Sequence, residues 1–214
     1  MPCNPSVGGV AKGHLVFEID ALGGEMGYAA DKVTLQSRTL NLGKGAAVHS
    51  KRVQADRAEY KRHMKAVLEG EPKLRLIQAE IVDILTEGEG EAKRVSAVVT
   101  SLGQVYSANR VIIASGTFLD SEIFVGDKTL SAGPDGMLPA IGLSSALKRE
   151  GVSMRRFKTG TPARVHRRSL DLSVMEEQVG EDAPVPFSAR TDEQSYATAP
   201  QLPCHIVYTN AITH

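Results

Sequence analysis

Apolar positions recur at helical spacing in two stretches of the first 70 residues. The first stretch is followed by Gly23-Gly24 and predicts a short amphipathic helix over 14–22, with Leu15, Val16, Ile19 and Leu22 on one face. A second helix is expected from about residue 54 to residue 69, where an apolar stripe faces many Lys and Arg residues and Pro72 prevents continuation. Residues 1–13 are rich in Gly and Pro, so a loop is expected there, with no strand before the first helix.

The pattern then changes to short apolar runs separated by glycine-containing turns. A strand and a β-meander are expected, with strands over 74–78, 81–85, 95–99 and 105–107. The next run, 111–114, is apolar throughout and ends at Ser115-Gly116-Thr117, as a strand buried on both faces does. The remaining pattern predicts a short helix, a polar surface excursion and an extended segment, over 139–151, 180–203 and 204–209.

The composition of the 214 residues fits a globular α/β protein: 42% are hydrophobic, enough for a sizeable core. The 25 Lys and Arg balance the 25 Asp and Glu, so bulk charge gives no attraction to nucleic acid. Two cysteines, no secretory leader at Met1 and no apolar run near 18 residues argue against secretion and against a membrane span. The six histidines are scattered and no Cys-x-x-Cys occurs, so no metal site is expected.

One local cluster of positive charge lies between residues 153 and 170, a stretch that contains neither Asp nor Glu. An anionic partner is favoured there over a solvated loop, because Arg binds oxyanions through paired N–H groups. The residues leave open whether that partner is RNA or the phosphate of a dinucleotide. The cations are Arg155, Arg156, Lys158, Arg164, Arg167 and Arg168, with His166 among them.

The two cysteines are candidates for nucleophilic chemistry. Cys3 precedes Gly8 and Gly9 in a loop whose backbone N–H groups can face an anionic or electron-rich ligand. Cys204 is followed by His205, but neighbouring side chains on an extended segment point to opposite faces, so His205 is poorly placed as its base. An inert structural role is the competing interpretation for each cysteine.

A meander followed by an apolar strand that ends in Ser115-Gly116 is typical of flavoproteins with two dinucleotide-binding domains, since glycine lets the backbone approach a flat cofactor. An ordinary strand-to-loop turn explains these residues equally well. Neither Gly-x-Gly-x-x-Gly nor a Walker A sequence occurs. Both ends are expected to be cut, because nothing before Cys3 supplies the first strand and crossover helix of a doubly wound sheet.

Seven segments occur in a fixed order along essentially all 214 residues: Cys3-Asn4-Pro5-Ser6-Val7-Gly8-Gly9, Lys12-Gly13-His14-Leu15, Ile19-Asp20-Ala21-Leu22-Gly23-Gly24, Gln54-Ala55-Asp56-Arg57, Gly116-Thr117-Phe118-Leu119, Lys158-Thr159-Gly160-Thr161-Pro162 and Pro203-Cys204. Taken together, they closely resemble the glucose-inhibited division protein A family. Its members are the FAD-containing subunit of the tRNA uridine 5-carboxymethylaminomethyl modification enzyme. So many matches in order are far more specific than any single motif.

The resemblance implies an α/β flavoprotein of the two-dinucleotide-binding-domain, glutathione-reductase-like type. The chain is expected to be an internal fragment of it, without the N-terminal glycine motif and the C-terminal region. Residues 1–130 are expected to be part of the FAD-binding domain, and residues 131–214 the truncated start of an inserted NADH-binding and substrate region. Where the family has Gly-Arg this chain has Gly133-Pro134, so an arginine expected near NADH phosphate is missing. Further departures are Ala46 and Ala163 in place of Pro, and the ending Asn210-Ala211-Ile212-Thr213-His214.

The resemblance also implies an activity. The enzyme contains FAD and uses NADH, a methylene-tetrahydrofolate carbon and glycine or ammonium to modify C5 of the wobble uridine in tRNA. A homodimer that works with a potassium-dependent GTPase is implied, in the bacterial cytoplasm or in an organelle. Two alternatives stay open, a folate- and FAD-dependent tRNA uridine C5-methyltransferase and a non-catalytic tRNA-binding fragment. The Lys158-Thr159-Gly160-Thr161-Pro162 segment favours the first activity over the methyltransferase.

Site residues are carried over position by position. Cys204 resembles the family's nucleophile or general-acid cysteine, and Cys3 resembles its second essential cysteine. Cofactor contacts are implied at Ile81, whose backbone would meet the FAD adenine, and also at Gly116, Thr117, Ala140, Gly8 and Gly9. The cations of the 153–170 stretch, together with Lys51, Arg52 and Arg57, are expected to contact phosphates of tRNA or of a dinucleotide.

Overall fold

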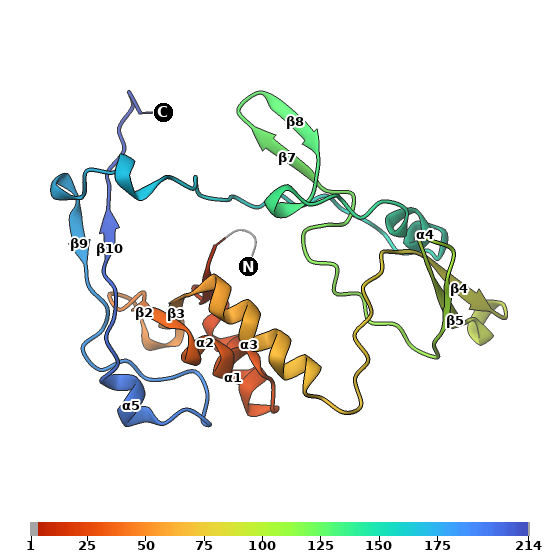
Figure 1. The fold of residues 1–214 in the computed structure, drawn as a ribbon, viewed down its shortest axis with the longest axis horizontal. Coiled ribbons are helices and arrows are strands. Elements are labelled where there is room, and N and C mark those ends of the chain that lie inside the picture. The colour runs from red at the N-terminus through yellow and green to blue at the C-terminus, as the bar shows by residue number, and fades with distance from the viewer. Residues whose placement is uncertain (1–3, 214) are drawn as a thin grey trace. The chain divides into compact units, whose positions relative to one another are not determined.

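A computed structural model describes residues 4–213 of the chain (Figure 1). The chain separates into two compact units. The first unit consists of residues 4–75 and 161–213, and the second consists of Leu76–Gly160. These bounds differ from a division between residues 130 and 131, because residues 131–160 belong to the same unit as the meander. The assignment of 1–130 and 131–214 to cofactor domains stays a prediction.

The first unit is built on an antiparallel sheet with strand order β1-β3-β2. Its strands are β1 (Ser6–Gly8), β2 (Thr34–Leu40) and β3 (Ser50–Ala55). The core gathers around Val53 of the central strand and contains Val7, Val16, Ala30, Ala55 and Phe187. Strand β1 corrects the prediction that residues 1–13 hold only a loop: three residues are too few to show an alternating pattern in the sequence.

Three helices accompany this sheet: α1 (Gly13–Ala21), α2 (Met26–Lys32) and α3 (Arg57–Glu69). Helices α1 and α3 confirm the two helices that the apolar spacing predicts. Asp56 caps α3 by accepting hydrogen bonds from the amides of Ala58 (2.9 Å) and Glu59 (3.1 Å). Within residues 4–213, no helix has the length and apolar character of a membrane span.

Residues 181–202, which we call the return segment, pack onto the first unit. They include α5 (Glu193–Ala197) and lie between β9 (Glu176–Gln178) and β10 (Cys204–Ile206), two strands that pair antiparallel (Figure 1). The prediction of a surface excursion over 180–203 is wrong for the aromatic residues, since Phe187 is 2% exposed and Tyr196 is 7% exposed. Isolated aromatic residues in a polar, proline-containing stretch show no periodicity, so only tertiary contacts reveal their burial.

The second unit contains the predicted meander, with antiparallel strands in the order β4-β5-β6. These are β4 (Ile81–Glu87), β5 (Arg94–Thr100) and β6 (Val105–Ser107). Helix α4 (Leu143–Arg149) packs on β4 and confirms the short helix expected within 139–151. A hairpin of β7 (Glu122–Val125) and β8 (Lys128–Ser131) is unpredicted. Short 3-10 helices lie at Ala46–Val48, Gly90–Ala92, Pro134–Gly136, Arg167–Ser169 and Leu172–Val174.

Two of the predicted strands are wrong. Residues 74–78 and 111–114 do not form strands, and Ile112 is 93% exposed. An apolar run is buried on both faces only where it is a central strand with neighbours on both edges. No strand of the described residues pairs with 111–114, so the run is extended but not covered.

Candidate functional site

A tight turn joins β1 to α1 and contains the two glycines predicted to face a cofactor. Gly8 and Gly9 have φ angles of 81° and 98°, in the region that favours glycine. The Gly9 amide donates a hydrogen bond to the carbonyl of Lys51 (2.8 Å) and is therefore not free for a ligand. A Cβ on Gly8 would collide with the same carbonyl oxygen, so a larger residue does not fit. Cys3, which precedes this turn, lies outside the described residues.

Cys204 is half-buried at the start of β10. Its thiol donates to the side-chain oxygen of Gln36 on β2, at 3.3 Å. The amide nitrogen of Gln36 donates in turn to the carbonyls of Gln178 (2.8 Å) and Leu202 (3.2 Å). His205 is exposed while its neighbours are half-buried, as expected for residues that alternate along a strand. The structure thus gives Cys204 a neutral hydrogen-bond partner, and sequence reasoning missed Gln36.

Lys51 is buried in β3, which corrects its place in an exposed basic face. It is 7% exposed, and its ammonium donates to the Ser37 hydroxyl (2.9 Å), the Tyr196 hydroxyl (3.2 Å) and the carbonyl of Val185. The ammonium nitrogen also lies 5.1 Å from the ring centroid of Phe187. An ammonium with three internal acceptors is a structural contact, so Lys51 is not available to bind phosphate at the surface.

Burial also shifts the proton affinity of this lysine. Desolvation lowers the pKa of Lys51 from 10.5 to about 8, although the charges of Asp31 and Glu181 act in the opposite direction. The two other basic residues proposed near it, Arg52 and Arg57, are half-buried. This face therefore presents less free positive charge than the sequence suggests.

Asp31 is a second buried charge of the first unit that sequence reasoning missed. Its carboxylate accepts hydrogen bonds from the amides of Phe187 (2.9 Å) and Ser188 (2.8 Å) and from the hydroxyl of Thr191 (2.8 Å). Burial raises the pKa of Asp31, while these hydrogen bonds and the charge of Lys51 lower it. Asp31 and Lys51 therefore both bind the return segment through hydrogen bonds.

The cationic stretch over 153–170 lies on the surface, as expected for positive side chains that have no acidic neighbours in the sequence. All six Lys and Arg side chains are exposed. Arg156 donates to the carbonyl of Asp120 (3.1 Å) and lies 3.9 Å from the Glu122 carboxylate. In the described part of the chain, no ion pair engages the other five: Arg155, Lys158, Arg164, Arg167 and Arg168. Exposed guanidinium groups of this kind are free to bind phosphate oxygens.

The residues carried over as FAD contacts in the second unit lie close together. The amide of Ala140 donates to the carbonyl of Phe118 (2.9 Å), directly after Gly116-Thr117. Ile81 packs on the same apolar cluster as Leu119. Gly116 has a φ of 59°, and a Cβ there would meet nothing within 4 Å, so its backbone faces open space. The structure therefore brings together Ile81, the Gly116-Thr117 turn and Ala140.

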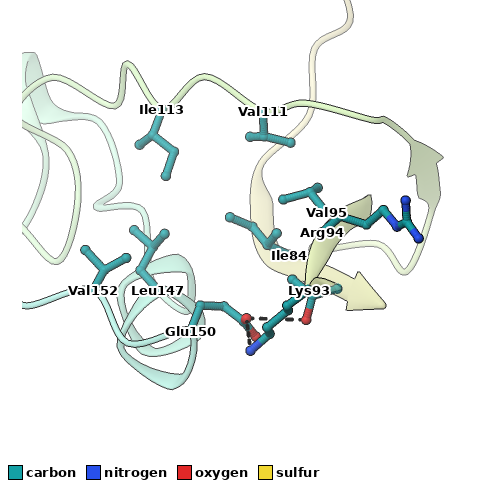
Figure 2. Close-up of a pocket in the computed structure, with 10 residues that line it drawn as sticks. Ile84, Lys93, Arg94, Val95, Val111, Ile113, Leu147, Glu150 and Val152 are labelled. Atoms are coloured by element: carbon teal, nitrogen blue, oxygen red, sulfur yellow. Dashed lines mark hydrogen bonds and ion pairs between the residues drawn. The ribbon is translucent and has the colours of Figure 1, made fainter. Parts of the chain in front are cut away.

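A cavity of about 250 Å³ opens beside α4 in the second unit (Figure 2). Its apolar lining comes from the meander, from α4 and the residues just after it, and from the run 111–114: Ile84, Val95, Leu147, Val152, Val111 and Ile113. The ammonium of Lys93 pairs with the carboxylate of Glu150 at its edge (2.7 Å), and this contact lowers the pKa of Glu150. The sequence shows the apolar run but not the cavity it lines. Among the described residues, no group of His, Cys, Asp and Glu is arranged to hold a metal ion.

The sequence of this chain is similar to that of a known protein family over its whole length. The sequence model of the family described as Glucose inhibited division protein A matches residues 1–214. A "tRNA uridine 5-carboxymethylaminomethyl modification enzyme MnmG" from Caldicellulosiruptor saccharolyticus is 52% identical over the whole chain, and one from Alkaliphilus oremlandii is 49% identical. The chain spans about a third (33%) of the length of these relatives.

Solved structures agree with the sequence comparison. GidA from Aquifex aeolicus matches with a TM-score of 0.85 and 41% identity, over 96% of this chain and 34% of that chain. A second crystal form of the same protein gives the same values. The predicted fold class, part of an α/β flavoprotein fold of the GidA type, is confirmed.

Proposed function

The chain belongs to the glucose inhibited division protein A family, and from that premise we propose that it is part of an enzyme that modifies C5 of the wobble uridine in tRNA. The group added would be carboxymethylaminomethyl or aminomethyl. The observation that carries the proposal is the family match over residues 1–214, with relatives named for this modification at 52% and 49% identity.

FAD is the proposed cofactor, and NADH and methylene-tetrahydrofolate are the proposed co-substrates. The residues of the second unit fit a flat cofactor, because the Gly116 backbone faces open space and Ala140 and Ile81 lie near the same turn. When bound, FAD would supply the redox chemistry. The chain's own contribution would be backbone contact at Ile81, Gly116, Thr117 and Ala140. On the first unit, the half-buried Gly8 stays a candidate contact, whereas Gly9 is buried and its amide is bonded to the Lys51 carbonyl.

The cationic stretch is the proposed contact with tRNA phosphates. Its arginines are exposed, and five of its six cations have no ion pair within residues 4–213, so phosphate binding at those five would break no salt bridge. Arg supplies a planar pair of donors that matches phosphate oxygens. Arg52 and Arg57 are retained as weaker candidates, whereas Lys51 is not.

A cysteine thiolate is the proposed nucleophile. C5 of uracil reacts with a one-carbon unit only after a nucleophile adds at C6 and creates an enolate, and a thiolate suits that addition. Cys3 and Cys204 are the candidates in this chain. The Cys204 thiol donates a hydrogen bond to the neutral Gln36 amide, so activation of this thiol would require a base or cation supplied by the bound complex.

A homodimer, a potassium-dependent GTPase partner and a location in the bacterial cytoplasm or an organelle belong to the same proposal. They follow from family membership, and tRNA is named as the target in the description of the relatives.

The proposal is tested with the full-length protein that contains this chain. The protein is purified with its flavin absorbance recorded, and it is incubated with unmodified tRNA, NADH, methylene-tetrahydrofolate, glycine or ammonium and the GTPase. The nucleosides are then analysed by mass spectrometry. We expect a flavin spectrum and a carboxymethylaminomethyl- or aminomethyluridine product. Methyluridine would instead identify the methyltransferase, and tRNA binding without flavin or product would identify a non-catalytic protein.

A further inference from the structure

Gln36 of β2 is a buried polar side chain at which several elements of the first unit meet. It is 2% exposed, and both polar atoms of its amide have partners. The amide nitrogen donates to the carbonyls of Gln178 (2.8 Å) and Leu202 (3.2 Å). The amide oxygen accepts from the Cys204 thiol (3.3 Å). Gln36 therefore joins β2 to β9, to the end of the return segment and to β10.

The backbone of β2 is irregular just before this residue. The pairing of β2 with β3 shifts in register between Thr34 and Gln36. A register shift of this kind re-aims the side chains of a strand. Leu35 lies within the shift, and its carbonyl accepts a hydrogen bond from the amide of Leu202 (2.8 Å). The backbone of the strand thus brings the residues next to Cys204 alongside Gln36.

The two backbone carbonyls determine which end of the Gln36 amide faces the sulfur. A carbonyl oxygen only accepts hydrogen bonds, so the NH₂ group must face Gln178 and Leu202, and the amide oxygen must face Cys204. An amide oxygen has no hydrogen to donate, so it can bond the S–H group of a thiol but not a thiolate. A thiolate at this position would lose the hydrogen bond and face the negative end of the amide dipole.

The charged groups of the surrounding elements do not replace this contact. On β9 and β10, Glu177 lies opposite His205, and alternation along each strand turns both side chains away from the face that holds Cys204. Within residues 4–213, no charged side chain is hydrogen-bonded to the sulfur. Four charged side chains of the neighbouring elements have hydrogen-bond partners elsewhere: Arg38, Lys51, Glu176 and Glu181.

We propose that Gln36 is a positioning residue that fixes the direction of the Cys204 side chain and holds it as a neutral thiol in the free enzyme. The inference deepens the proposed function and rests on it, because Cys204 is there a candidate for the reacting cysteine. Gln36 is buried and acts through the sulfur. A thiol held in this way is protected from oxidation and alkylation, since both reactions follow thiolate character. The reactive form would then appear when a base or cation of the bound complex displaces this contact.

The test uses the full-length protein that contains this chain and compares wild type with Gln36→Met, Gln36→Glu and Gln201→Met. Methionine has the length of glutamine but only a weak acceptor, whereas glutamate keeps its acceptor oxygens. Gln201→Met is the matched control. Gln201 also ties the return segment to β2, since its side-chain oxygen accepts from the Ser37 amide (2.7 Å), but it has no hydrogen bond to Cys204.

The measured quantity is the rate at which iodoacetamide alkylates the Cys204 peptide, followed by mass spectrometry. It is recorded at about pH 7 and about pH 10, on either side of the reference value of a thiol, about 8.5. The ratio of the two rates reports ionisation of the sulfur, because a change in access alters both rates by the same factor.

We expect this ratio, pH 7 over pH 10, to be about 3-fold higher in Gln36→Met than in wild type, because a contact that only the thiol makes is lost. In Gln36→Glu the ratio should not exceed that of wild type, since a carboxylate disfavours a second negative charge beside it. In Gln201→Met the ratio should equal that of wild type, even if loosening of the segment raises both rates.

An unchanged ratio in Gln36→Met would overturn the proposal, and so would an equal increase in Gln201→Met. If Gln36→Met fails to fold, the infrared difference spectrum between wild type and Cys204→Ser at about pH 7 decides. We expect an S–H stretching band at lower frequency than in the unfolded chain, because the S–H group is hydrogen-bonded. A missing band, or a band at the unfolded frequency, would overturn the proposal. Neither measurement requires tRNA or co-substrates, so failure here is distinct from failure of the proposed function.

Discussion

Raising the pH from about 7.5 to about 9.5 is expected to stabilise the first unit through Lys51. Burial lowers the pKa of Lys51 to about 8 in the folded protein, against 10.5 for the exposed group. Between these values the folded protein has released the proton while the unfolded chain still binds it, so the free energy of unfolding rises with pH. At about 1.4 kcal/mol per pH unit, the whole effect is about 3 kcal/mol, of which about 2 kcal/mol falls in this window.

The tyrosines set the upper limit of the window. Burial raises the pKa of Tyr196 and of Tyr60, so the folded protein keeps protons that these groups lose in the unfolded chain. Their contribution to stability is present below the unfolded pKa and decreases only above about pH 10. The Lys51 effect is therefore measured below that pH.

The assay is urea unfolding of the chain, followed by circular dichroism at several pH values, for wild type and Lys51→Met. Methionine keeps an apolar side chain of similar length and has no proton to release. We expect the free energy of unfolding to rise by about 2 kcal/mol more in wild type than in Lys51→Met. The control is Lys61→Met, on the exposed side of α3, which should follow wild type. Parallel curves for wild type and Lys51→Met would refute the argument that burial depresses this pKa.

Three further predictions concern the site and its support. Replacing Cys204 with Ser should abolish tRNA modification and leave flavin absorbance intact, because a hydroxyl keeps the hydrogen bond to Gln36 but is a weak nucleophile; wild-type product in nucleoside mass spectrometry would exclude a nucleophilic role. Asp31→Asn should lower the free energy of unfolding by about 2 kcal/mol, because the asparagine NH₂ group would face the backbone N–H groups that now donate to the carboxylate. An unfolding midpoint equal to that of the exposed control Asp182→Asn would contradict this. Filter-binding titrations should show weaker tRNA binding and a shallower salt dependence when Gln replaces Arg164, Arg167 and Arg168, by about 0.7–0.9 in slope for each phosphate that the protein no longer neutralises. An unchanged slope would make these residues a solvated loop.

Locally periodic elements could be predicted from the sequence. Helices α1 and α3 and the meander β4–β6 appear in the structure near their expected residues. Their signals are contained in short windows: an apolar stripe, a capping Asp56 and β-branched runs between glycine turns. Strands β2 and β3 lack such a signal, because their buried positions include Ser37 and Lys51. Burial of these residues depends on partners far along the chain.

For the candidate site too, some features could be predicted from neighbouring residues and others depend on distant contacts. The sequence identified both cysteines, the glycine turn and the exposed cationic stretch, since each is a property of neighbouring residues. From the sequence, Lys51 was expected at the surface, because a lysine is almost never fully buried unless it is paired. Its partners Val185 and Tyr196 are 134 and 145 residues away, and no local pattern indicates them.

By itself the sequence determined the family, the periodic helices and strands and the excess of positive charge at 153–170, because ordered motifs and neighbouring residues carry that information. The tertiary structure alone decided that Asp31 and Lys51 are buried against Phe187, next to Gly8. It also decided that the run 111–114 lines a cavity instead of forming a strand. The physical reason is that burial of a charge or an isolated aromatic ring is stabilised only by the hydrogen bonds and packing that folding supplies.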